Sequence, residues 1–185
     1  MDVGLIGRAA GMFAVTNLDD LVLLAVFFGQ AAGRRGQVKV VAGQFLGFAA
    51  ILAVSVAGAL GAGLLPDGAV RWLGVLPILL GLRAAWQAFH TGDDEPVPAA
   101  GVLGIALVCF ANGGDNVGVY VPAFAASGSL ASYVVVFLVG VAVWCVAGRF
   151  LATRPAVARV LARRGHLVLP VVLVGLGVLI LAGAF

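Results

Sequence analysis

The sequence has few charged residues and only two histidines. Charged residues make up 10% of its 185 residues, against about 25% in an average soluble domain. Hydrophobic residues make up 63%, and the mean hydropathy is +1.16. A chain with so little polar surface cannot cover a water-soluble core. The composition therefore excludes an ordinary soluble domain and predicts an integral membrane protein.

Cysteine and nucleotide-binding motifs are also scarce or absent. Cys109 and Cys145 are the only cysteines, and both lie in apolar runs without CxxC spacing. This excludes a disulfide framework and favours buried, inert thiols. The sequence contains no GxxxxGK[ST] motif, so any transport is expected to be secondary rather than driven by ATP. The basic residues lie between apolar runs and not in a soluble patch, which argues against nucleic-acid binding.

Long apolar segments are what the sequence does contain. Six of them, at residues 5–32, 38–65, 69–89, 97–126, 130–150 and 166–185, predict six transmembrane helices in one domain covering residues 1–185. The connectors are then residues 33–37, 66–68, 90–96, 127–129 and 151–165. Trp72, Trp86 and Tyr133 lie near segment ends, as in the aromatic belts of membrane proteins.

The basic residues predict how the chain is oriented in the membrane. Connectors one, three and five, with the adjoining segment ends, contain Arg34, Arg35, Lys39, Arg149, Arg154, Arg159, Arg163 and Arg164. The positive-inside rule places these connectors in the cytoplasm and both termini on the other side. The amphipathic connector 151–165 is expected to lie on the membrane surface. The connector from His90 to Glu95 is cytoplasmic in this scheme, and its part in capturing cations is left open.

The two halves of the sequence resemble each other. Aligning Asp19 with Asp115 matches residues 19–21 to residues 115–117, and Phe28 to Phe124. Each half, about 1–92 and 97–185, holds three spans. An odd number of spans inverts the second half relative to the first, as in many secondary transporters. We therefore predict an all-α membrane protein with six transmembrane helices in a 3+3 inverted repeat.

Polar residues interrupt the first and fourth segments near their middles. The interruptions are residues 16–20 (TNLDD) and 112–116 (NGGDN). Each carboxylate at the bilayer centre costs about 2.5–3.5 kcal/mol, and no lysine or arginine lies at matching depth. Irregular backbone at this depth is tolerated only where it is buried in protein or lines a cavity. The pattern predicts discontinuous first and fourth helices that enclose a cation site at the midplane.

The candidate ligands all carry side-chain oxygens. Asp19 and Asp115 are expected to be the core ligands, assisted by Asp20, Asn17, Asn112 and Asn116, with Gln44 as a further oxygen donor. Adjacent helical residues point about 100° apart, so Asp19 is expected to face the site more directly than Asp20. Tyr120 and Pro122 are candidates for shaping the pathway. The competing interpretation is that the asparagines only join helices.

These motifs are similar to those of a known family. Residues 112–122 (NGGDNVGVYVP) resemble the signature of the cadmium-resistance (CadD-type) transporters of the LysE superfamily. Residues 16–20 with Phe27 and Phe28, residues 43–47 and residues 73–81 resemble three further motifs in the same order. The resemblance implies an exporter of divalent cations in the plasma membrane, with cadmium as substrate and zinc as a common companion. It implies no enzyme activity and no cofactor besides the transported metal.

Two residues depart from the family pattern, and some alternatives stay open. Some relatives have a cysteine where Asn112 stands, and Asp20 is an additional carboxylate. Both changes favour harder ions such as Mn²⁺ or Zn²⁺. Proton antiport is the expected coupling, because the same carboxylates bind protons or metal. The alternatives are a LysE-like amino-acid exporter and an intramembrane aspartyl protease, and a homodimer is one candidate assembly.

Overall fold

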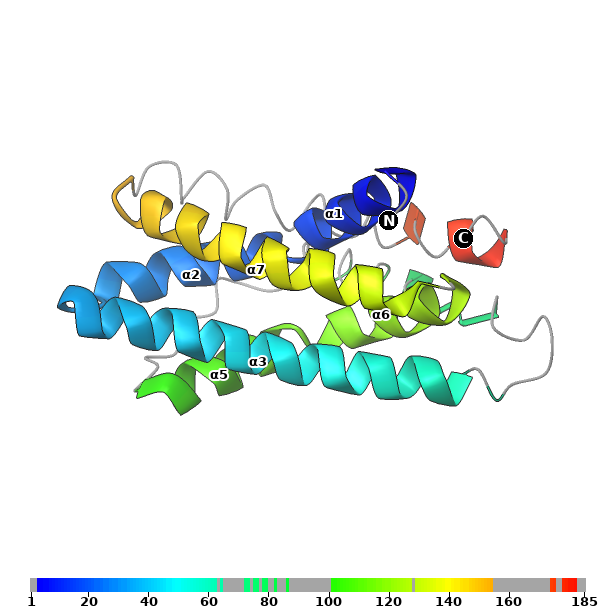
Figure 1. The fold of residues 1–185 in the computed structure, drawn as a ribbon, viewed down its shortest axis with the longest axis horizontal. Coiled ribbons are helices and arrows are strands. Elements are labelled where there is room, and N and C mark those ends of the chain that lie inside the picture. Colours follow the sequence, from blue (N-terminus) through cyan, green and yellow to red (C-terminus); the bar gives the residue numbers. More distant parts are fainter. Residues whose placement is uncertain are drawn as a thin grey trace.

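The described part of the chain is built from α-helices. The computed structural model describes residues 3–62, 101–127 and 129–154, with isolated positions between 64 and 86 and between 174 and 182. These residues contain no β-strand. The helices are α1 (Val3–Thr16), α2 (Leu18–Gln30), α3 (Gly33–Ala62), α5 (Gly101–Asn112), α6 (Gly114–Ala126) and α7 (Leu130–Ala152), as shown in Figure 1.

Two of these helices and two bent pairs have the length and composition of membrane spans. Helices α3 and α7 are each long and apolar enough to cross a bilayer. The pair α1 and α2 is bent by 59°, and the pair α5 and α6 by 62°. Both breaks fall within the interruptions predicted from the sequence. The expected third and sixth spans lie largely outside the described residues, as do connectors 66–68 and 90–96 and residues 155–165.

The two broken pairs share the same internal layout. A constant offset of 96 residues relates the second pair to the first. It separates the end of α1 from the end of α5, the start of α2 from the start of α6, and the end of α2 from the end of α6. Asp19 and Asp115 have the same separation. Figure 1 shows that the pair α1–α2 and the pair α5–α6 run in opposite directions. This layout supports the sequence alignment of the two halves.

The first connector is shorter than the sequence predicts. Residues 33–37 were expected to form it, but they belong to the start of α3, and only Ala31 and Ala32 join α2 to α3. The correction has a simple reason. Arginine and glutamine are good helix formers, so the helix extends past the end of its apolar segment. Gly33, with φ at 64°, adopts the left-handed conformation that this sharp turn requires.

Each long helix packs against the broken pair of the other half. Helix α3 lies against α5 and α6, and α7 lies against α1 and α2. Glycines make these approaches close. A Cβ atom at Gly47 would lie 2.5 Å from the Ala106 carbonyl oxygen, and one at Gly148 would lie 2.6 Å from the Leu24 Cβ. Small residues at such crossings let the helix backbones approach, as is typical of membrane helices.

Aromatic side chains fill the space between α1, α3, α6 and α7. Phe137 on α7 packs against the rings of Phe13, Phe48, Tyr120 and Phe124. Tyr133 is part of the same cluster and is only 1% exposed. Its assignment to an aromatic belt was therefore wrong. A tyrosine near a helix end can turn inwards when aromatic neighbours on the next helix cover its ring.

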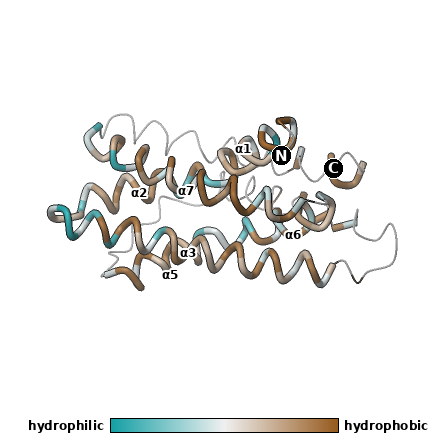
Figure 2. Tube along the Cα trace, in the orientation of Figure 1, coloured by the Kyte–Doolittle hydropathy of each residue, from teal (hydrophilic) through white to brown (hydrophobic). Residues whose placement is uncertain are grey.

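The outer faces of the long helices are apolar and exposed. On α7 the exposed side chains include Val139, Val143, Val146 and Phe150, which follow helical spacing along one face. Figure 2 shows hydrophobic residues along most of the helices, and hydrophilic ones where α3 begins and α7 ends. A continuous exposed apolar face of this kind suits contact with lipid.

We predict that Gly47→Val destabilises the protein, because the added methyl groups would collide with the α5 backbone. Overpacking of this kind costs about 1–3 kcal/mol. Gly61→Val is the matched control, since Gly61 lies on the same helix with open space around its Cβ position. Thermal unfolding of the purified variants in detergent should show a lower midpoint for Gly47→Val only. Equal midpoints would contradict the close packing of α3 on α5.

Candidate functional site

The candidate site lies where the two helix breaks meet. Both helices that follow a break begin with carboxylates in their first turn: Asp19 and Asp20 on α2, and Asp115 on α6. The N-terminal end of a helix carries a partial positive charge. Each break therefore offsets part of the negative charge that its own sequence brings into the protein.

Two adjacent carboxylates are joined by one amide group from the other half. The Asn112 Nδ2 atom donates to Asp19 Oδ2 and to Asp20 Oδ1, each at 2.9 Å. Both carboxylates reach the same nitrogen, so the hydrogen bonds do not single out either one. That Asp19 faces the site more directly than Asp20 stays a prediction. Asn17, directly before α2, has φ −115° and ψ 25°, so the two aspartates follow a non-helical residue and not an uninterrupted helix.

Asp20 is the most enclosed carboxylate of the group. Its side chain is 2% exposed, and its Oδ2 atom accepts a hydrogen bond of 2.9 Å from the Gln44 Nε2 atom. The Cys109 thiol lies 4.0 Å from the same oxygen and 3.8 Å from the Gln44 carbonyl oxygen. Asp115 lies in the first turn of α6, at the other break. Among the described residues, the hydrogen-bond partners of Asp19 and Asp20 include neutral amides and no lysine or arginine.

A second polar cluster lies beside the carboxylates. The Asn17 Nδ2 atom donates to the Tyr120 hydroxyl at 2.8 Å, and the Asn116 Nδ2 atom donates to Asn17 Oδ1 at 3.2 Å. The Thr16 and Tyr120 hydroxyls are 2.9 Å apart. The Trp144 indole on α7 donates to the Asn17 carbonyl oxygen at 2.6 Å. Asn17 and Asn116 therefore join the two breaks through this cluster, whereas Asn112 joins them through the carboxylates.

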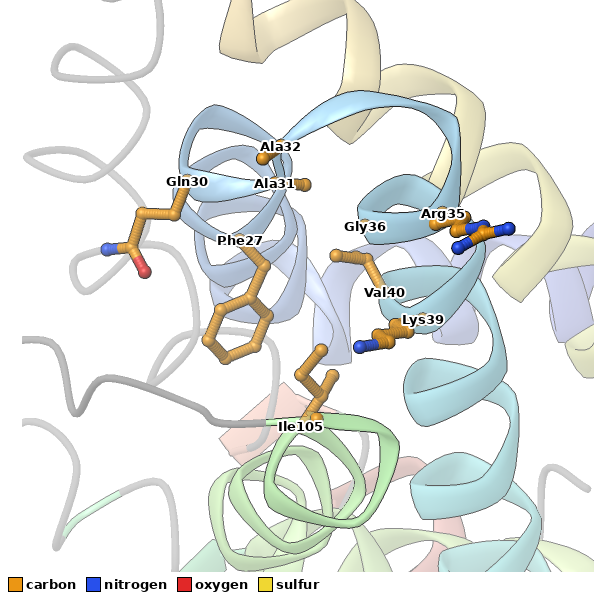
Figure 3. A pocket seen from close by; sticks show the side chains of 10 residues that line it. Phe27, Gln30, Ala31, Ala32, Arg35, Gly36, Lys39, Val40 and Ile105 are labelled. Atoms are coloured by element: carbon orange, nitrogen blue, oxygen red, sulfur yellow. The ribbon is translucent and has the colours of Figure 1, made fainter.

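The described residues do not form a ready-made metal cage. No three histidine, cysteine, aspartate or glutamate side chains within them are grouped closely enough to hold a metal ion. A cavity of about 350 Å³ opens between α2, α3 and α5. In Figure 3, Phe27, Lys39 and Ile105 point towards this cavity. Among the described residues its lining contains Arg35 and Lys39 and no carboxylate, and these two cations do not favour a metal ion there.

Sequence reasoning missed two residues that contact this region. Cys109 was interpreted as inert, but it lies one helical turn before Asn112 and therefore on the same side of α5. That spacing is a signal that could have placed it near the site. No role for Trp144 was predicted, although an indole N–H in the middle of an apolar span needs a hydrogen-bond acceptor when it is buried.

Comparison with known proteins gives a clear family assignment. The family model described as cadmium resistance transporter matches residues 13–184. No curated protein and no solved structure matches this chain. The matched range covers both helix breaks and almost the whole sequence. The chain therefore belongs to the cadmium resistance transporter family, whose members are membrane proteins of metal-ion transport and resistance.

Proposed function

We propose that this protein is a secondary exporter of divalent metal cations that exchanges metal for protons. One observation carries the proposal: the carboxylates of Asp19 and Asp20 from one half converge on the Asn112 amide from the other. Asp20 is buried and Asp19 partly buried, and the described side chains that donate to them are neutral. Such carboxylates attract a cation strongly, because burial weakens the screening of their charge. The family assignment supports metal as the cargo.

A cation would bind by replacing the two N–H contacts of Asn112. The amide nitrogen bridges the Asp19 and Asp20 oxygens, so an ion at that position would contact both carboxylates. Turning the amide group over would present the Asn112 oxygen to the ion as a third ligand. Asp115 would add negative charge from the other break. We assign Gln44 to holding Asp20, because its nitrogen and not its oxygen points to that carboxylate.

The neighbouring groups suggest which metals the site accepts. Carboxylate and amide oxygens suit Mn²⁺ and Zn²⁺, whereas thiolates select softer ions. The Cys109 sulfur lies 4.0 Å from Asp20 Oδ2, so the side chains would have to draw closer around an ion before the sulfur could become a ligand. A site with both oxygen and sulfur donors suits Cd²⁺ and Zn²⁺ better than oxygen donors alone. We assign Asn17 and Asn116 to the cluster that joins the breaks and not to direct contact with the metal.

The same reasoning extends to the architecture. We propose six spans in a 3+3 inverted repeat within one domain, with α1–α2 and α5–α6 as the broken spans. The shared spacing of 96 residues and the similar bends of 59° and 62° support this arrangement. We place the protein in the plasma membrane with both termini outside the cytoplasm, because the basic end of α3 and α7 fits the positive-inside rule. A LysE-like amino-acid exporter is the alternative, and exchange of labelled lysine for unlabelled lysine would reveal it.

We predict that Asp19→Asn, Asp20→Asn and Asp115→Asn each abolish metal resistance while the protein still inserts. Asparagine keeps the shape of aspartate but removes the charge that binds the cation. Growth of a metal-sensitive host on Cd²⁺, with protein level measured by immunoblot, tests this. Ser55→Ala is the control, since Ser55 is also buried but donates to the Ile51 carbonyl of its own helix and, among the described residues, to no carboxylate. Normal resistance from a well-expressed variant would remove that aspartate from the site.

We predict that Cys109→Ser weakens Cd²⁺ binding about tenfold, or about 1.4 kcal/mol, while Mn²⁺ binding changes little. Serine retains a hydrogen-bonding group of similar size but lacks the soft sulfur atom. Calorimetric titration of the purified protein with each metal measures both affinities. Cys145→Ser replaces the other buried free cysteine and should leave the ratio of the two affinities unchanged. An unchanged ratio in Cys109→Ser would show that the thiol is not a ligand.

We predict that a proton gradient drives metal exit. Protons compete with metal for the same carboxylates, so acid on the exit side should displace the ion and reprotonate the site. In vesicles oriented as in the cell, acid outside should accelerate the exit of Cd²⁺, and a protonophore should slow it. Flux that ignores the pH gradient at a clamped membrane potential would reject antiport and leave a facilitator or another coupling ion.

A further inference from the structure

A groove between α2, α3 and α7 has basic side chains at one end and apolar side chains along the rest of its lining. We call the basic end the mouth of the groove and the apolar lining its floor. Its volume is about 520 Å³, and its lining includes Phe28, Arg34, Val41, Phe45, Val146 and Arg149. Arg34 lies in the first turn of α3, and Arg149 lies in the last turn of α7. Figure 1 shows these two helix ends at the same end of the molecule. The groove therefore has a charged end and an apolar end.

From its charged end to its apolar end, the groove has about the length of one membrane leaflet. Arg34, Val38, Val41 and Phe45 all line the groove from α3, at the spacing of a single helix face. Eleven residues separate Arg34 from Phe45, which is about 16 Å along a helix. Half of a hydrocarbon core is about 15 Å. A lipid chain starting at the arginines would follow this face to about the bilayer centre.

The mouth of the groove carries positive charge that the described carboxylates do not balance. Those carboxylates are Asp19, Asp20 and Asp115, and all three lie at the helix breaks. Arg34 is also placed where the helix dipole of α3 is positive, which disfavours a cation. Arginines at two helix ends around one groove are thus well placed to bind an anion between them.

We propose that this groove binds one anionic phospholipid of the leaflet at this end of the molecule. Its phosphate lies between Arg34 and Arg149, and one acyl chain lies along Val41, Phe45 and Val146. Basic pockets between membrane helices bind anionic headgroups, and the anionic lipids gather in the cytoplasmic leaflet. The apolar floor distinguishes a lipid from free phosphate, because inorganic phosphate would leave that part of the groove without a partner. This inference does not depend on the proposed transport function.

The bound lipid would connect the helices that hold the metal site. Phe28 lies on α2, two helical turns after Asp20, and α3 and α7 contribute Gln44 and Trp144 to the breaks. A ligand that contacts α2, α3 and α7 binds only while these helices are packed together. Its binding therefore stabilises the packed arrangement relative to one in which the helices have moved apart.

The test is retention of lipid by the purified full-length protein, measured by native mass spectrometry with phosphatidylglycerol and phosphatidylcholine. We expect phosphatidylglycerol to bind in preference. The double variant Arg34→Gln, Arg149→Gln should lose about thirtyfold in its affinity, which corresponds to about 1 kcal/mol for each arginine. Arg35→Gln and Arg154→Gln are the matched controls. Arg35 lies next to Arg34 but lines the other cavity, and Arg154 lies over the Phe150 ring.

A second variant distinguishes binding of a lipid from binding of a simple anion. It also keeps the proposal testable if the double variant does not fold. Ala42 is exposed and lines the groove, so Ala42→Trp should block the acyl chain while leaving both arginines in place. Loss of phosphatidylglycerol in this variant supports the proposal. Equal loss in the Arg35 or Arg154 controls would overturn it, as would equal retention of phosphatidylcholine. If millimolar inorganic phosphate competes with phosphatidylglycerol, and Ala42→Trp does not lose phosphatidylglycerol, the ligand of the groove is a free anion and not a lipid.

Discussion

The structure depends on how it accommodates negative charge inside an apolar bundle in which, among the described residues, no lysine or arginine bonds to Asp19 or Asp20. Asp20 is almost completely buried, and the Gln44 and Asn112 amides donate to it. An unpaired carboxylate at this depth would cost several kcal/mol. The protein limits this cost with the positive ends of two helices and with the amide of Asn112. These devices need both helix breaks in one place, so the two halves must meet at their breaks.

The packing of the long helices follows from that requirement. Helices α3 and α7 each cross to the other half, and glycines allow them to approach closely. From these positions the Gln44 amide reaches Asp20, and the Trp144 indole reaches the Asn17 carbonyl. The second cluster, around Tyr120, bonds the breaks together without charge. Gln44, which holds Asp20 in place, is therefore a different residue from Asn112, which bridges Asp19 and Asp20.

Much of this arrangement could be predicted from the sequence, because the strongest signals are local. Polar residues in the middle of an apolar segment mark the breaks, and the spacing between Asp19 and Asp115 matches the spacing of the helix ends. The partners of each side chain could not be predicted, because they depend on how helices cross. No sequence pattern distinguishes Asn112, which bonds to Asp19 and Asp20, from Asn116, which bonds to Asn17. The same limit applies to Cys109 and to Tyr133, whose surroundings come from other helices.

The bridge at Asn112 also bears on the choice between exchange and simple release. Asp19 and Asp20 come from one half and Asn112 from the other, so any movement that separates the halves removes the amide from the carboxylates. The two charges would then repel each other in a poorly screened space. In the exchange that we propose, a bound divalent cation would neutralise them during one movement, and protons would neutralise them during the return. A carrier with such a site would move more easily when it always carries one or the other, which is why we propose antiport and not uncoupled release.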